Sequence, residues 1–307
     1  MKNLTSCLLL LFLFCNCKTT SQHGTWCQSQ CNAAGDEKAN TELVEKIREN
    51  IDPNDENFGK EALTFPLRVS IVTDRIEPIY VDKKLIEKTV DILNEGFANT
   101  FVNFDLAVID TIFSPLLISD LSKDGYRPYR LFSQEHDRPD IITLFLFDYD
   151  KDLCRQEGSS ISCSRSGGFS YVLSRSANNV VMSKFELADH KVVVHEFGHF
   201  FGLYHTFEEF QFGKEKPDGS NCDVAGDRFC DTPADPGNIY EVHVNYSMCE
   251  MLGNKDPETG VEYKPMLNNY MAYYRPCYLR KYEFTPMQLA FIYTSSRSEI
   301  RRKFARE

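Results

Sequence analysis

The stretch at residues 195–205, which reads HEFGHFFGLYH, constrains this chain more than any other feature. Residues four positions apart lie on the same face of an α-helix, so His195 and His199 can present two imidazole nitrogens to one metal ion. Gly202 can adopt the positive φ of a sharp turn at little steric cost, and such a turn would bring His205 back as a third ligand. The spacing therefore predicts a helix that ends beside a three-histidine metal site.

Three neutral histidine ligands are typical of a catalytic zinc site, because they leave the fourth tetrahedral position to water. Zinc lowers the pKa of this water from 15.7 to about 7, and Glu196, beside the first histidine, is placed to act as general base. Glu196 would then pass the proton to the leaving amine, which makes peptide-bond hydrolysis the predicted reaction. The alternative for an isolated HExxH is a surface helix with two satisfied histidines, which the glycine, the third histidine and the downstream sequence disfavour.

Three segments of this chain resemble the pappalysin family of metzincin metalloproteases. Residues 195–207 (HEFGHFFGLYHTF) resemble its extended zinc motif, and residues 226–233 (GDRFCDTP) resemble its GDxxxDTP segment. Residues 269–273 (NYMAY) resemble its Met-turn, usually NYMDY, from which Ala272 departs. The resemblance extends over residues 64–307 and is strongest from residue 190 onward.

The resemblance implies roles for further residues near the zinc ligands. It implies that Met271 lies beneath the ligands as an apolar floor, a role that suits a flexible thioether. The matching tyrosine of the family lies near the metal, so Tyr273 is a candidate catalytic residue whose hydroxyl would bind the oxyanion of the tetrahedral intermediate. An ordinary buried core tyrosine is the alternative.

The segment after the third histidine is irregular and acidic. Pappalysin-like proteins carry calcium in this lobe, and carboxylate and carbonyl oxygens suit this ion. Asp227, Asp231 and Thr232 are therefore candidate calcium ligands or close neighbours of them. The alternative is that Asp, Asn, Gly and Pro simply form turns here.

Alternating and helical apolar patterns predict the elements before the zinc motif. Strands are predicted at residues 67–73, 104–109, 141–147 and 179–182, and a helix at residues 83–97. A last helix is predicted within residues 284–302, with Thr285 as N-cap and Pro286 at its first position. With the resemblance, this order predicts an α+β, metzincin-type two-lobed catalytic domain. Its N-terminal lobe would hold a twisted mixed sheet, a backing helix and the zinc-site helix, with a substrate cleft along one edge strand, and its irregular, disulfide-bonded C-terminal lobe would end in a helix.

Residues 1–17 are predicted to be an export signal. Lys2 supplies the positive charge, and residues 8–14 form an apolar run too short to span a bilayer. Cys17 or Cys15 could carry a lipid anchor at the end of this run, and plain secretion is the alternative.

Residues 18–63 are polar and are predicted to be a linker or a pro-segment, with a short helix at residues 41–50 headed by Thr41. A pro-segment could block the zinc through Cys27 or Cys31, as cysteine switches do in some metzincins. A local bridge between these two cysteines argues against such a switch. Residues 64–307 are then the catalytic domain.

The chain has 11 cysteines, and most should be paired in an exported protein. Their connectivity does not follow from the sequence. The family pattern implies a Cys222–Cys249 bridge, which leaves Cys230 for Cys277, and Cys154–Cys163 would close a local loop. A cysteine-rich zinc site is the alternative, but it lacks CxxC spacing.

Composition narrows the class of partner. A formal net charge of −11 and a pI near 5.2 argue against nucleic acid or an anionic membrane surface as the main partner. Extracellular proteins or peptides fit better as substrates, and contact with a membrane would come only through the lipid anchor. The chain is thus predicted to be a secreted or surface-anchored zinc endopeptidase with Zn²⁺, and in addition Ca²⁺, as cofactors. A catalytically silent surface binding protein or adhesin, and a purely structural zinc site, are the alternatives, against which Glu196 weighs.

Overall fold

A computed structural model describes residues 34–52, 58–73, 81–114, 127–147, 153–157, 160–164, 167–237, 243–275, 277 and 280–306. The predicted export signal, the two cysteines proposed for lipidation, and Cys27 and Cys31 lie outside these residues. Among the helices of the described part, none has both the length and the apolar character that a membrane span requires.

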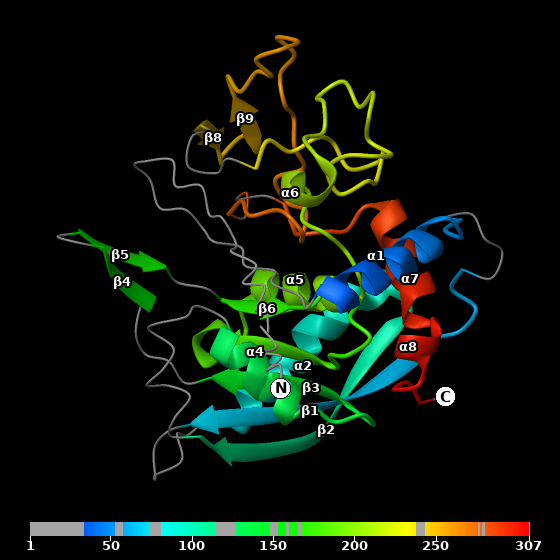
Figure 1. Ribbon diagram of the computed structural model, residues 1–307, viewed down its shortest axis with the longest axis vertical. Helices are drawn as coiled ribbons and strands as arrows, with labels where there is room; N and C mark the ends of the chain where they lie inside the picture. Colours follow the sequence, from blue (N-terminus) through cyan, green and yellow to red (C-terminus); the bar gives the residue numbers. More distant parts are fainter. Residues whose placement is uncertain are drawn as a thin grey trace, which may run out of the picture.

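A five-stranded mixed sheet forms the base of the molecule, in the order β2-β1-β3-β7-β6 (Figure 1). Four strands run parallel, and the edge strand β6 is antiparallel to β7. The predicted mixed sheet is confirmed; β1, β2 and β7 are longer than the apolar patterns indicated, and β3 is one residue shorter. The strands are β1 (Leu63–Thr73), β2 (Val102–Phe113), β3 (Ile142–Phe147), β6 (Gly168–Ser170) and β7 (Asn179–Ser183).

Helices cover both faces of this sheet. Successive side chains of a strand point to opposite faces, so apolar residues on both faces are buried under these helices. Leu144 and Leu146 of β3 point into the main core with α2 (Lys83–Phe97) and α5 (His190–Phe200). Phe145 and Phe147 point the other way and pack against α4 (Arg127–Glu135). The strand is buried on both sides, so its sequence is an unbroken apolar run. Two short 3₁₀ helices, Ala98–Thr100 and Lys184–Glu186, connect these elements.

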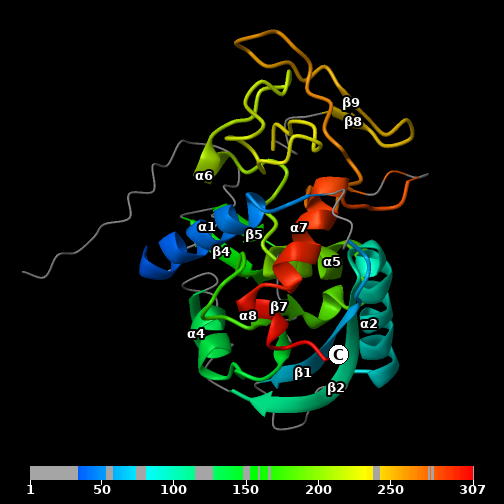
Figure 2. The ribbon, with the colours of Figure 1, turned by 90° about the vertical axis from the view of Figure 1, so that its right-hand side faces the viewer.

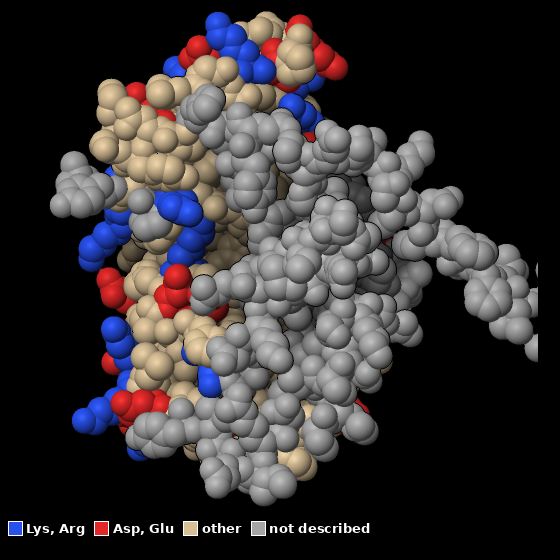
Figure 3. Space-filling view, turned by 90° about the vertical axis from the view of Figure 1, so that its left-hand side faces the viewer, with Lys and Arg blue, Asp and Glu red and all other residues tan. Residues whose placement is uncertain are grey.

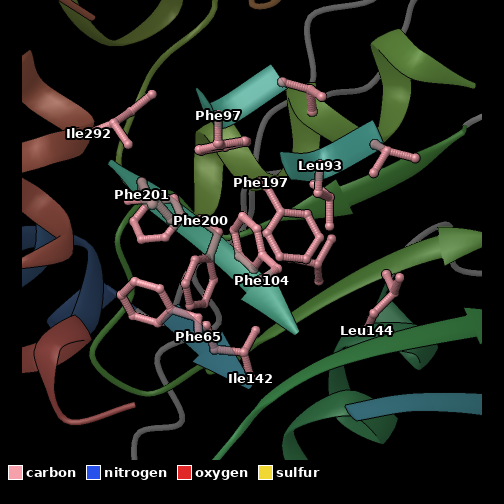
Figure 4. Packing of buried hydrophobic residues seen from close by; sticks show 14 of the residues in the cluster. Phe65, Leu93, Phe97, Phe104, Ile142, Leu144, Phe197, Phe200, Phe201 and Ile292 are labelled. Atoms are coloured by element: carbon pink, nitrogen blue, oxygen red, sulfur yellow. The ribbon is translucent and has the colours of Figure 1, made fainter. Parts of the chain in front are cut away.

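Phenylalanine rings hold α5 in the main core. The Phe97 ring of α2 lies 5.5 Å from Phe104 of β2 and 5.7 Å from Phe201, just after α5. The Phe104 ring also lies 5.1 Å from Phe197, in the middle of α5 (Figure 4). Edge-to-face contacts of this kind add about 0.5–1.5 kcal/mol beyond burial. The helix that carries the histidines is therefore fixed to the sheet through its apolar face.

Most of the C-terminal lobe is irregular and lies on the other side of α5 from the sheet (Figure 1). Its regular parts are α6 (Glu209–Phe212) and a hairpin of β8 (His243–Asn245) and β9 (Glu250–Leu252). The predicted bridges between Cys222 and Cys249 and between Cys230 and Cys277 are wrong. The structure joins Cys222 to Cys230, with Cα atoms 5.0 Å apart, and Cys249 to Cys277, at 5.4 Å.

Local turns explain the observed pairing. Gly219, Gly226 and Arg228 all have positive φ, so the chain folds back on itself and brings Cys222 next to Cys230. Cys249 instead packs with the segment after the Met-turn, which contains Cys277. Cys154 and Cys163 stand opposite each other in the hairpin of β4 (Leu153–Glu157) and β5 (Ser160–Ser164), and their bond stays a prediction.

The segment predicted to be a linker or pro-segment contains a helix that packs on the C-terminal lobe. This helix, α1 (Ala34–Arg48), begins seven residues before the predicted Thr41 cap. Its first residues include Ala34, Glu37 and Lys38, which favour helix formation and offset the unfavourable Gly35. The Arg48 guanidinium donates to the Asp227 carbonyl at 2.8 Å and lies 4.4 Å over the Phe229 ring. Figure 2 shows α1 beside α7. Residues 34–48 are thus part of the folded unit.

The predicted last helix is two helices, α7 (Pro286–Ser296) and α8 (Glu299–Arg302). The Thr285 cap with Pro286 at the first position is confirmed. The helix stops early because the Ser296 and Ser298 hydroxyls donate to the carbonyls of Tyr293 and Ser295, at 2.7 and 2.6 Å. Such bonds compete with helix continuation.

Arg301 of α8 is fully buried and ties the end of the chain to the end of α5. Its guanidinium donates to the Phe200 carbonyl at 2.8 and 3.1 Å and to the Ser174 carbonyl at 3.1 Å. It also lies 3.8 Å over the Phe200 ring. Burial lowers the pKa of Arg301 to about 9. The Phe200 carbonyl is one of the helix-end acceptors that need a partner from outside the helix.

We expect Arg301→Met to lower the free energy of unfolding by about 3 kcal/mol, because it leaves buried carbonyls without donors. Urea unfolding would measure this. The control is Arg302→Met, which removes a half-exposed ion pair with Glu61 at 3.1 Å and should change stability by less than about 1 kcal/mol. Equal effects of the two substitutions would contradict the anchoring role of Arg301.

Candidate metal centre

The helix α5 presents two histidines from one buried face. It begins at Asp189, whose carboxylate accepts two backbone N–H groups of the first turn, at 2.9 and 3.0 Å, as a good N-cap does. Phe197 faces the main core, while His195 and His199 lie one turn apart and are only 6% and 5% exposed. The helix therefore delivers both imidazoles to a space shielded from water.

A tight turn after α5 brings the third histidine back to the other two. Gly202 has a φ of +103°, as predicted, and its N–H donates to the His199 carbonyl at 2.8 Å. Leu203 N–H donates to the Gly198 carbonyl at 3.0 Å. His205 then lies next to His199, with ring centroids 4.5 Å apart.

The three imidazoles converge through their Nε2 atoms. His199 Nε2 lies 3.1 Å from His195 Nε2 and 3.0 Å from His205 Nε2. On the far side of the rings, His195 Nδ1 lies 2.7 Å from the Tyr270 carbonyl and His199 Nδ1 lies 2.7 Å from the Leu203 carbonyl. A carbonyl can only accept, so each Nδ1 carries the proton and each Nε2 of these two rings points a lone pair inward.

This arrangement fits a metal ion. Burial lowers the pKa of His195 and of His199 well below the usual value, which disfavours a proton on either Nε2 atom. Protonation therefore does not remove the repulsion between the lone pairs that face one another. Zinc binds three such nitrogens at about 2.0–2.1 Å each, which matches their close approach. Within the described residues, this is the one group that brings three or more His, Cys, Asp or Glu ligands together.

Glu196 is buried beside this centre. Burial raises its pKa to about 8, and its Oε2 atom has no hydrogen-bond partner within the described structure. The edge strand β6 lies against it, because a Cβ on Gly168 would be 3.1 Å from Glu196 Cγ. A cation at the three nitrogens would favour the ionised carboxylate and oppose the effect of burial.

The segment that contains Met271 packs against α5. Met271 is fully buried, and a Cβ on Gly198 would lie 2.6 Å from its Sδ, so the glycine leaves room for the thioether. The Met271 N–H donates to Asn269 Oδ1 at 2.8 Å, and Asn269 Nδ2 donates to Gln288 of α7 at 2.8 Å. The turn is thereby anchored to α7.

The last two residues of the NYMAY segment have different surroundings. Ala272 is fully buried in an apolar cluster with Leu267 and Tyr274, so the small side chain fits where the family has aspartate. Tyr273 is 38% exposed, and its ring lies 4.8 Å from His205 and 5.6 Å from His195. The structure thus places Tyr273 beside two of the three imidazoles.

The candidate calcium ligands connect the acidic segment to α7. Asp231 accepts from Thr285 Oγ1 at 2.9 Å and from Met287 N at 2.8 Å. Asp227 is fully buried, and its carboxylate accepts a hydrogen bond from Phe229 N at 3.0 Å. Thr232 is also buried. Burial raises the pKa of Asp227 well above the usual value. Calcium binding by these residues stays a prediction.

Asp235 is a site residue that the sequence reading missed. Its carboxylate accepts from Thr206 Oγ1 at 2.6 Å and from the Tyr274 hydroxyl at 2.6 Å. It therefore joins the residue after His205 to the residue after Tyr273. Its sequence context, two residues after the GDxxxDTP segment, gives only a turn signal.

Known proteins match both the sequence and the fold. The family model described as pregnancy-associated plasma protein-A matches residues 170–290. An extracellular metalloprotease of Colletotrichum graminicola is 26% identical over 268 residues, which cover 82% of this chain and 84% of the relative. An extracellular metalloprotease of Pyricularia oryzae is 26% identical over 245 residues, which cover 75% and 74%. A solved structure of a promirolysin mutant from Tannerella forsythia superposes with a TM-score of 0.52 at 14% identity, covers 89% of this chain and 92% of that one, and supports the fold.

The matches and the three-histidine centre define the chain as a zinc metalloprotease of the metzincin class. Within that class, the family model over residues 170–290 and the matched extracellular metalloproteases support a protease of the pappalysin family.

We expect Gly202→Ala to lower the free energy of unfolding by about 1–3 kcal/mol and to weaken zinc binding. The φ of +103° strains any Cβ, which would also lie 2.9 Å from Phe291 Cε1 and 3.1 Å from Leu173 Cβ. Thermal unfolding and a zinc titration would measure both effects.

The matched control is Gly219→Ala, at φ +70° with no atom within 4 Å of the added Cβ. It should lose about 1 kcal/mol and bind zinc normally. If Gly202→Ala behaved like this control in both measurements, the turn would not position His205.

Proposed function

We propose that this chain is an endopeptidase that binds zinc through the Nε2 atoms of His195, His199 and His205 and uses Glu196 as general base. The observation that carries this proposal is the convergence of three buried imidazole nitrogens, 3.0 and 3.1 Å apart, beside a buried carboxylate. A purely structural zinc site does not require such a carboxylate, and neither does a silent binding protein or adhesin.

Zinc, when bound, supplies the acidity that activates a water molecule and polarises a carbonyl group. Glu196 then has two tasks. As a carboxylate, the form that a bound cation favours against the effect of burial, it accepts the proton of the attacking water. The same proton can pass to the amine that leaves, because a carboxyl group with a pKa near the working pH serves as base and as acid.

Tyr273 is proposed to assist by hydrogen bonding. Its ring packs against His205 at 4.8 Å and against Phe207 at 4.7 Å, and the side chain remains partly exposed. A phenol in this position can donate to the oxygen on which charge develops when the scissile carbonyl is attacked.

The edge strand β6 is the proposed binding site for the substrate backbone. It pairs with β7 on one side and ends the sheet on the other, within the described residues. It also lies against Glu196 through Gly168. An extended peptide that adds to this edge would lie beside the three histidines.

We further propose that the protein is exported, with residues 1–17 as signal and with either free secretion or a lipid anchor at Cys17 or Cys15. The names of the relatives, which are extracellular metalloproteases, support export. The catalytic unit would comprise residues 64–307, and calcium at Asp227, Asp231 and Thr232 would stabilise its C-terminal lobe. Extracellular proteins or peptides are the proposed substrates.

We expect Glu196→Gln to lower the rate of casein cleavage by about 100-fold or more, because the isosteric amide cannot accept a proton. Zinc content, measured on the same sample, should stay at the wild-type level. Cleavage by the wild-type protein should stop with a zinc chelator and return with added zinc. Cleavage that survives both the chelator and the substitution would rule the proposal out.

We expect Tyr273→Phe to lower kcat by about 10–100-fold with little change in KM, because the lost hydrogen bond forms only as charge develops. Peptide cleavage at several substrate concentrations separates the two constants. Phe207→Leu, which alters the packing of the Tyr273 ring but keeps the hydroxyl, is the control. An unchanged kcat in Tyr273→Phe would remove this residue from the mechanism.

A further inference from the structure

The three histidines differ in what lies behind them. His195 and His199 each have a neutral backbone carbonyl at Nδ1. His205 instead has a carboxyl group, because its Nδ1 lies 3.6 Å from Glu208 Oε2, which is longer than a direct hydrogen bond but close enough for an electrostatic interaction. Only the third imidazole of the centre is thus backed by a negative charge.

The contact between these two side chains is local and buried. Glu208 follows His205 by three residues, and its N–H donates to the His205 carbonyl at 3.1 Å, so a turn holds the two residues together. The side chains are 4% and 8% exposed, which limits screening by water. Within the described part of the chain, Glu208 has one contact within salt-bridge distance, which is the contact with His205. No described Lys or Arg forms an ion pair with Glu208.

We propose that Glu208 is a positioning residue that attracts the Nδ1 side of the His205 ring and makes its Nε2 a stronger zinc ligand. This inference rests on the proposed zinc binding by the three histidines. A carboxylate behind a ligand histidine fixes the tautomer and the ring orientation and raises the basicity of the coordinating nitrogen.

The charge balance of the centre supports this role. A dication on three neutral imidazoles leaves two positive charges in a buried space, and an uncompensated buried charge is costly. Glu196 follows His195 in the sequence, Glu208 lies 3.6 Å from His205, and both side chains are buried. Glu208 thus adds a second acidic side chain beside the centre.

The two acidic side chains have different places in the proposal. Glu196 accepts and releases a proton, whereas Glu208 lies behind the His205 ring. Sequence reading assigned no role to Glu208, because it stands in an acidic run where turn formation is the default interpretation. The signal was its spacing of three residues from the last histidine.

The test compares the zinc affinity of the full chain with that of Glu208→Gln, measured by competition with a chelator of known affinity. Gln keeps the size and an acceptor oxygen but removes the charge, so we expect zinc to bind about 10-fold more weakly, and Glu208→Ala to weaken binding by up to about 100-fold. Glu209→Gln is the matched control, because it removes one acid from the exposed neighbouring position. It should bind zinc as the wild type does.

Two further readouts separate a positioning role from a general effect on folding. The metal-free Glu208→Gln protein should unfold at the wild-type temperature, while the visible absorption of the cobalt-loaded protein should shift. Glu208→Asp, which keeps the charge on a shorter side chain, should recover part of the affinity. If Glu208→Ala does not fold, the Gln and Asp variants still carry the test.

Failure of this inference and failure of the proposed function give different results. If wild type and Glu208→Gln bind zinc equally well, Glu208 is not a positioning residue, and the zinc site itself stands. If the wild type binds no zinc, or if His205→Ala binds it undiminished, the proposed function fails first.

Discussion

Imidazole nitrogens that meet in a buried space repel one another unless a cation joins them, and this constraint organises the molecule. His195 and His199 stay in place because their outer nitrogens donate to the carbonyls of Tyr270 and Leu203. The first carbonyl belongs to the Met-turn and the second to the turn after α5. Because Tyr270 and Leu203 also belong to the main core, the packing of the core holds both carbonyls in place behind the imidazoles.

Several segments distant in sequence converge on this helix. The sheet and α2 contact the helix through phenylalanine rings, and Met271 fills the space beside Gly198. At the end of the helix, the Arg301 guanidinium donates a hydrogen bond to the Phe200 carbonyl. Asp235 then links Thr206 to Tyr274, so the segments that carry His205 and Tyr273 move together. The geometry of the centre is thus determined by both lobes.

Local chemistry made part of this structure predictable. The bounds of α2 agree with its helical periodicity, and Gly202 has the positive φ that the motif spacing demanded. The disulfide pairing was wrong because it depends on how an irregular loop folds back, which no periodic pattern encodes. Arg301, Asp235 and the packing of α1 on the C-terminal lobe were missed for a related reason. Their partners are backbone carbonyls, hydroxyls and loop segments far away in the sequence, and a charged residue in isolation indicates only a solvated surface.

The acidic run after His205 shows why net charge is a poor guide to substrate here. Glu208, Glu215, Asp227 and Asp235 are buried, where they accept hydrogen bonds or face other side chains rather than solvent. The acids that remain exposed in this run stand close in sequence to exposed Lys214 and Lys216. On the described part of the face in Figure 3, acidic and basic residues are likewise interspersed. A net charge of −11 therefore does not describe the surface that a substrate meets. The buried acids of the C-terminal lobe supply hydrogen-bond acceptors inside it, beside its small apolar cluster. Because these acids do not face solvent, net charge does not predict which peptides would bind at the proposed site along β6.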